Sequence, residues 1–129
     1  MARPPSQEPT DVELKILRIL WRDGPSPVRA VHERLQHNKT TNYSTTVKML
    51  SVMLRKALIT RDDQARPQVY RAVVSQKATQ RHMLSRLIEN VYEGSAKSLV
   101  LHALASRRAD AADRAEIRRL LDELGRGKT

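Results

Sequence analysis

The segment Asn42–Lys56 carries hydroxyl and cationic side chains at helical spacing and contains no acid. At about 100° per residue, the positions that fall within one arc of roughly 60° are Ser44, Lys48, Ser51 and Arg55. No Asp or Glu occurs between Thr40 and Arg61. Because solvated helix faces usually mix both signs of charge, this acid-free face is typical of a surface that meets a polyanion. A surface helix that only happens to lack acids fits this segment, taken alone, equally well.

The chemistry that these residue types offer is recognition of nucleic acid. Small hydroxyl groups allow a helix to approach base edges closely, while lysine and arginine reach phosphates or guanine. The opposite arc, roughly 140° wide, is apolar and is expected to pack inward. Its members are Thr46, Met49, Leu50, Met53, Leu54 and Ala57.

Residues for catalysis or metal binding are not found at productive spacings. The chain has no cysteine, and its four histidines show no metal-ligand spacing such as His-Glu-x-x-His. No glycine-rich phosphate loop or G-x-S-x-G motif occurs. The adjacent pair Asp62–Asp63 is better suited to forming a turn than to acid–base chemistry. We therefore expect no enzyme activity, no cofactor and no metal site.

The overall composition agrees with a nucleic-acid partner. The chain has 24 Lys and Arg against 14 Asp and Glu, a formal net charge of +10. This favours nucleic acid, and less strongly an anionic membrane surface. Aromatic residues make up only 3% of the chain, which favours duplex DNA over the stacking of single strands. No membrane span or signal segment is recognised, so we expect no membrane insertion and a cytoplasmic, nucleoid-associated location.

Two helices are expected ahead of this segment. Thr10 and Glu13 form a capping box, and the helix that they open stops at Asp23-Gly24-Pro25, with Trp21 as a core anchor. Ser26 is expected to cap a second helix that has Pro27 at its first position, turns Val28, Val31 and Leu35 inward and ends by His37–Lys39. Asn42 or Ser44 then caps the third helix.

A short β-hairpin is expected to follow the third helix. Residues 58–61 and 68–73 are β-prone, and the turn-rich stretch 62–67 between them places Arg66 at the tip. Three helices followed by a basic hairpin predict a winged helix-turn-helix, with the third helix in the major groove and the wing on the adjacent backbone or minor groove. A merely solvated Arg66 is the alternative.

The predicted DNA contacts divide by role. Ser44, Thr45 and Lys48 are expected to contact bases or adjoining phosphates. Val47 is expected to meet a thymine methyl group, and the remaining contacts serve mainly the DNA backbone. The complete predicted set is Lys39, Tyr43, Ser44, Thr45, Val47, Lys48, Ser51, Arg55, Arg66 and Arg71.

From Ser75 onward the pattern is helical and has little core of its own. The helical runs reach Glu93-Gly94, then span 95–106, then open at Asp110 with Asp113 and end at Gly125. Burial against a second copy of the chain is the expected solution, and folding back on the same chain is the alternative. The predicted dimer contacts are Leu84, Leu87, Ile88, Val91, Leu99, Val100, Leu101, Leu104, Ile117, Leu120, Leu121 and Leu124.

The expected organisation is mainly α with a small β-hairpin wing. Residues 1–9 form a flexible lead, 10–74 a winged helix-turn-helix DNA-binding domain, 75–125 a helical dimerisation domain and 126–129 a tail.

An ordered series of segments carries a family resemblance. Its members are Glu13–Trp21, Pro27–Leu35, Tyr43–Leu50, Lys56–Ile59, Val69–Ala72 and Tyr92–Leu101. Together they resemble the penicillinase-repressor family of winged-helix transcriptional regulators (BlaI/MecI/CopY) over most of residues 10–125. The resemblance implies a dimer that represses promoters by binding operators with dyad symmetry. In much of the family, a membrane sensor-protease pathway relieves repression through cleavage in the dimerisation domain.

The chain departs from the family pattern at three places. His102-Ala103 stands where cleaved members carry Asn-Phe, which puts proteolytic induction in doubt. The paired C-x-C motifs of the copper-responsive branch are missing, which disfavours that kind of metal sensing. Ala57 replaces the glycine that commonly ends the recognition helix, so the turn must form without a residue that favours positive φ.

The sequence thus predicts a homodimeric transcriptional repressor that binds a palindromic operator in double-stranded DNA. The alternatives are an architectural DNA-binding protein without sequence preference and a winged-helix module that binds another protein.

Overall fold

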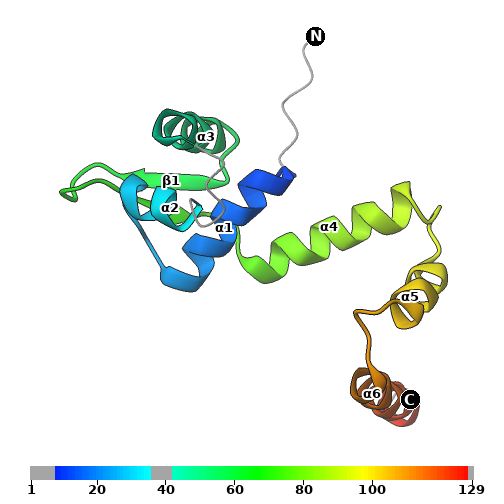
Figure 1. The fold of residues 1–129 in the computed structure, drawn as a ribbon. Helices are drawn as coiled ribbons and strands as arrows, with labels where there is room; N and C mark the ends of the chain where they lie inside the picture. The colour runs from blue at the N-terminus through cyan, green and yellow to red at the C-terminus, as the bar shows by residue number, and fades with distance from the viewer. Residues whose placement is uncertain (1–7, 36–41, 128–129) are drawn as a thin grey trace. The chain divides into compact units, whose positions relative to one another are not determined.

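The computed structural model describes residues 8–35 and 42–127. It contains α1 (Asp11–Asp23), α2 (Val28–Leu35), α3 (Tyr43–Arg55), β1 (Ile59–Asp62), β2 (Val69–Ala72), α4 (Gln76–Asn90), α5 (Ala96–Ala105) and α6 (Ala111–Gly127) (Figure 1). The chain divides into two compact units within α4, between Met83 and Leu84. Mostly helical structure with an antiparallel hairpin confirms the predicted fold class, a winged helix with a helical arm.

The first helix begins and ends as the sequence predicts. Thr10 Oγ1 accepts from the Glu13 amide at 3.2 Å, and Glu13 Oε1 accepts from the Thr10 amide at 3.0 Å. This capping box satisfies two amides that the helix itself leaves unpaired. Gly24 ends α1 with φ of 80°, a conformation that glycine adopts without steric cost.

The predicted capping of α2 by Ser26 is wrong. The Ser26 hydroxyl donates to Gly24 O at 2.9 Å, and its backbone pairs in both directions with Tyr70, at 3.0 and 2.8 Å. Ser26 is therefore held in an extended bridge to β2, and α2 begins two residues later at Val28. Val31 is buried and Val28 half-buried, in agreement with the predicted inward face. The predicted helix end at His37–Lys39 lies outside the described residues.

Helix α3 is capped by Asn42, one of the two predicted caps. Asn42 Oδ1 accepts from the Thr45 amide at 2.9 Å. The helix ends at Arg55, and Ala57 beyond it has φ of 62°. Ala57 is exposed, so its predicted place on the inward face is wrong; the chain has already left the helix there.

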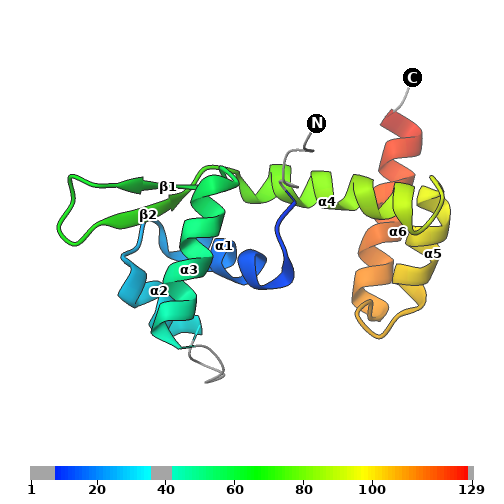
Figure 2. The ribbon, with the colours of Figure 1, turned by 90° about the horizontal axis from the view of Figure 1, so that it is seen from above.

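The wing is a two-stranded antiparallel hairpin. Ile59 pairs with Ala72, and Asp62 pairs with Val69. The tip between the strands projects beyond α1, α2 and α3 (Figure 2). Asp62 Oδ1 accepts from the Gln64 amide at 3.0 Å, which agrees with the predicted turn-forming role of the acidic pair.

One apolar core joins the helices to the wing. Its buried members come from α1, α2, α3, the β1 region and β2: Ile16, Leu17, Leu20, Val31, Leu50, Met53, Leu58, Ile59 and Tyr70. Trp21 packs against this core, and its Nε1 donates to Val74 O at 2.9 Å. The predicted anchoring role of Trp21 is thereby confirmed.

An ion pair joins the start of α1 to the end of α3. Lys56 Nζ lies 2.6 Å from Glu13 Oε1, and the two side chains are only 11% and 7% exposed. The same carboxylate closes the α1 capping box. This shielded contact therefore links α3 to α1 in addition to the apolar core.

The second unit contains the rest of α4 and the antiparallel helices α5 and α6 (Figure 2). Ser95 caps α5, and Asp110 and Asp113 bond each other's amides at 2.8 and 3.2 Å ahead of α6. The predicted end at Gly125 is wrong, because α6 continues to Gly127. A glycine weakens a helix by about 1 kcal/mol but does not remove its hydrogen bonds. No described residue from Leu84 to Gly127 is buried.

Candidate DNA-binding surface

The two faces of α3 differ in burial as the sequence predicts. Thr46, Leu50 and Met53 are buried in the core. The predicted DNA contacts on this helix all lie on its exposed side: Tyr43, Ser44, Thr45, Val47, Lys48, Ser51 and Arg55. Val47 keeps 39% of its surface exposed although it is apolar. All seven are therefore accessible, and Ser44, Lys48, Ser51 and Arg55 share one narrow arc of the helix.

The cap of α3 also orients its two leading hydroxyl groups. Asn42 Oδ1 lies 3.0 Å from Ser44 Oγ and 2.8 Å from Thr45 Oγ1. A carboxamide oxygen has no proton, so both hydroxyls must donate to it. Their lone pairs remain available as acceptors. While the cap is intact, Ser44 and Thr45 thus match the amino groups of adenine and cytosine better than they match phosphate oxygens.

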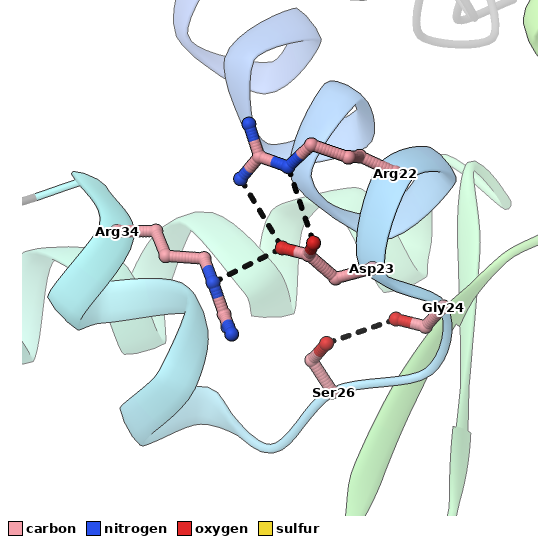
Figure 3. Close-up of polar contacts among 5 residues, drawn as sticks. All are labelled: Arg22, Asp23, Gly24, Ser26 and Arg34. Carbon is pink, nitrogen blue, oxygen red and sulfur yellow. Dashed lines mark hydrogen bonds and ion pairs between the residues drawn. The ribbon is translucent and has the colours of Figure 1, made fainter.

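The cations on this face have no acidic partner within the described part of the chain. Neither Lys48 nor Arg55 forms an ion pair there, and α3 contains no acid. On α2, by contrast, Arg34 Nε lies 3.0 Å from Asp23 Oδ2, and Asp23 also binds Arg22 at 3.1 Å (Figure 3). The hydrogen bond from Arg22 lowers the pKa of Asp23 and raises the pKa of Arg22. The free cations of α3 are therefore distinct from the paired ones nearby.

Of the three arginines in the wing, one forms an ion pair and two have no acidic partner in the described part of the chain. Arg61 Nε donates to Asp63 Oδ1, and this hydrogen bond raises the pKa of Arg61. Arg66 lies at the tip as predicted, and its Nη1 donates to the carbonyl oxygens of Asp63 and Ala65. Arg71 is exposed on β2. Since carbonyl groups carry no net charge, the charge of Arg66 is not neutralised by these bonds.

One residue beside this surface was not singled out from the sequence. Arg29 of α2 lies over the ring of Tyr43, with its guanidinium carbon 5.0 Å from the centroid. His32, one turn along α2, meets the same ring edge-on at 5.2 Å. The spacing of three residues between Arg29 and His32 was a readable signal, but their aromatic partner lies on another helix. The predicted contact Lys39 lies outside the described residues.

The predicted dimer contacts are accessible in the single chain. Ile88, Leu99, Leu104 and Ile117 are half-buried. The others are exposed, by as much as 64% for Val91: Leu84, Leu87, Val91, Val100, Leu101, Leu120, Leu121 and Leu124. His102 and Ala103, which replace the expected cleavage bond, lie inside α5. The second unit thus presents many apolar side chains for its size.

Two kinds of feature are missing from the part of the chain that the structure describes. Across residues 8–35 and 42–127, no three His, Cys, Asp or Glu side chains gather closely enough to hold a metal ion. None of the helices in those ranges has the length and apolar character needed to cross a membrane.

Comparison with known families gives one clear match. A family model described as penicillinase repressor matches residues 9–123, which includes the three helices, the wing and most of the second unit. A search of curated proteins finds no match.

Proposed function

The chain belongs to the penicillinase repressor family of transcriptional regulators. On that premise we propose that it is a homodimeric transcriptional repressor that binds a two-fold operator in duplex DNA. The observation that carries the proposal is the exposed, acid-free face of α3 opposite its buried core face. A helix of this kind fits the major groove, where base pairs are distinguishable by their donors and acceptors.

Base reading is assigned to the N-terminal half of that face. Ser44 and Thr45 offer oriented acceptors, and Lys48 lies one turn beyond Ser44. Lysine donates to guanine O6 or N7, and Val47 supplies apolar contact for a thymine methyl group. Backbone contacts are assigned to Tyr43, Ser51 and Arg55 on α3, with Arg66 and Arg71 in the wing and the predicted Lys39.

Dimer formation is assigned to the second unit. This unit has no buried residue from Leu84 to Gly127, and its exposed apolar side chains lie on all three of its helices. When a second copy covers these side chains, each Å² of apolar surface removed from water stabilises the dimer by about 25 cal/mol. A two-fold dimer then presents two α3 helices to half-sites about one helical turn apart.

The domain roles and cellular setting follow from this assignment. We assign DNA binding to residues 10–74 and dimerisation to 75–125. A repressor works where the chromosome is, so we place the protein in the cytoplasm with the nucleoid. Release through a membrane sensor-protease pathway stays a prediction of the family resemblance. Its test is whether the chain is cut at His102-Ala103 in induced cells.

The proposal is tested by selecting duplexes from a random library with the full-length protein. We expect a two-fold consensus whose half-sites are about 10 bp apart, or a multiple of that spacing, and strong discrimination against scrambled sequence. A selected-to-scrambled affinity ratio near one would instead indicate an architectural DNA-binding protein. Absence of tight duplex binding at about 0.15 M salt would indicate a protein-interaction module.

A further inference from the structure

Helix α2 carries two arginines whose guanidinium groups are engaged in different ways. Arg34 turns an N–H group toward the carboxylate of Asp23, at 3.0 Å (Figure 3). Arg29 instead lies over the ring of Tyr43, 5.0 Å from its centroid. No carboxylate in the described part of the chain lies within ion-pair distance of Arg29. A guanidinium that lies over a ring and has no carboxylate partner keeps its charge unneutralised, so its N–H groups remain available for an anion.

The ring beneath Arg29 is itself held in place. His32 meets Tyr43 at an interplanar angle of 82°, and His32 Nδ1 lies 2.9 Å from Thr46 Oγ1. Thr46 is fully buried. A series of contacts therefore links the exposed Arg29 to the core through Tyr43, His32 and Thr46. This support keeps the guanidinium in one position, which lowers the entropy lost when it binds a ligand.

The position of Arg29 relative to α3 indicates which ligand it meets. Tyr43 is the first residue of α3, directly before the base-reading candidates Ser44 and Thr45. Its hydroxyl group has no hydrogen-bond partner within residues 8–35 and 42–127, so a second donor is available beside Arg29. The N-terminus of a helix also favours anions. A guanidinium and a phenol at this end of the reading helix suit a phosphodiester oxygen.

We propose that Arg29 and Tyr43 form a phosphate site that clamps the DNA backbone at the N-terminal end of α3. The site rests on the proposed function, since its ligand is a phosphate of the bound duplex. It extends the DNA-binding surface from α3 and the wing onto α2. Because a phosphate contact carries no sequence information, the clamp fixes the register of α3 in the groove rather than choosing the base.

The test compares the Arg29→Ala and Arg34→Ala variants of the full-length protein. Arg34 is the matched control, because it lies on the same helix but already faces Asp23. Binding to the library-selected duplex and to a scrambled duplex is measured by fluorescence anisotropy at several salt concentrations. Each lost phosphate contact lowers the slope of log affinity against log salt by about 0.9. For a dimer with two clamps we expect Arg29→Ala to lower the slope by about 1.8 on both duplexes.

The outcomes separate the clamp from the proposed function. With that difference in slope, the ratio of parent affinity to Arg29→Ala affinity is about 12-fold smaller at about 200 mM salt than at about 50 mM salt. For Arg34→Ala, the ratio to the parent is expected to be the same at both salt concentrations. Tyr43→Leu removes the ring and the phenol but keeps the charge of Arg29, and it is expected to weaken binding to both duplexes to a similar extent, as the loss of a phosphate contact does. Equal slopes for Arg29→Ala and the parent, or equal losses in both arginine variants, would overturn the clamp while leaving repressor function intact. Failure of the parent to bind either duplex would overturn both proposals.

Discussion

Replacing Ala57 by glycine is expected to stabilise this protein, although glycine is usually destabilising in an ordered chain. Ala57 follows the end of α3 with φ of 62°. The Leu58 amide donates to Met53 O at 3.0 Å, and the Ala57 amide donates to Leu54 O at 3.1 Å. These two bonds form a Schellman motif, in which the left-handed position strongly favours glycine. Leu58 and Met53 are both buried, so the motif also holds an apolar contact.

The size of the effect follows from two opposing terms. A side chain with a Cβ atom costs roughly 1–2 kcal/mol in the left-handed helical region. Glycine loses that strain but gains about 0.4–1 kcal/mol of conformational entropy in the unfolded chain. The methyl group of Ala57 is exposed, so its removal costs little packing. The net expectation is that Ala57→Gly raises the free energy of unfolding by about 0.8 kcal/mol.

The assay is urea and thermal unfolding of the full-length protein, followed by circular dichroism. A gain of this size raises the melting temperature of a domain like the first unit by roughly 3–6 °C. Ala78→Gly is the matched control, because Ala78 is exposed within α4, and there glycine is expected to cost about 0.5 kcal/mol. If Ala57→Gly lowered stability as Ala78→Gly does, the left-handed end of α3 would be refuted.

Four further outcomes follow from the contacts described above. Lys56→Met leaves the Glu13 carboxylate buried without its ammonium partner, and we expect a loss of about 3 kcal/mol in urea unfolding, partly recovered in the Glu13→Gln/Lys56→Met double variant. Arg66→Ala is expected to weaken selected and scrambled duplexes alike and to lower the salt slope by about 0.9 per subunit; a change in sequence preference would contradict the backbone assignment. Leu121→Glu places a charge among exposed apolar side chains and is expected to yield monomers in analytical ultracentrifugation where the parent is dimeric. The pKa of Asp23 is lower in the folded protein than its ordinary value of 3.8, so its contribution to stability is present above pH 3.8. This contribution is lost as the pH falls through the pKa of Asp23 in the folded protein. Asp23→Asn is therefore expected to remove part of the dependence of the unfolding free energy on acid pH, measured by urea unfolding at several pH values.

Local signals made the boundaries of α1 and the start of α3 predictable. The capping box of α1 and the Asn42 cap of α3 each depend on residues three apart in sequence. The burial pattern of α3 follows from helical periodicity, so its exposed face was also correctly predicted. Ser26 was misjudged because its partner, Tyr70, belongs to a strand far along the chain. A local capping signal gives way there to a long-range backbone pairing.

The residues of the candidate site also differ in whether neighbouring sequence or a distant contact reveals them. Charge and spacing were enough to propose Lys48 and its neighbours as DNA contacts, because these signals depend only on one helix. Arg29 was not proposed from the sequence, because its contact is with a ring on α3 that packs beside α2. The left-handed conformation of Ala57 lies between these cases: the sequence showed that the usual glycine was missing, and the structure shows that the turn forms in spite of it.

The central claim, that α3 reads bases, is tested most directly by the specificity of Lys48→Ala. The measurement is the ratio of affinities for the selected and scrambled duplexes, with Lys15→Ala, an exposed lysine of α1, as the matched control. A base contact of this kind supplies about 1–3 kcal/mol of discrimination, so we expect the ratio to fall by roughly 5- to 150-fold for each half-site in Lys48→Ala. The ratio in Lys15→Ala is expected to match the parent. An unchanged ratio in Lys48→Ala would contradict the assignment of this face of α3 to the major groove.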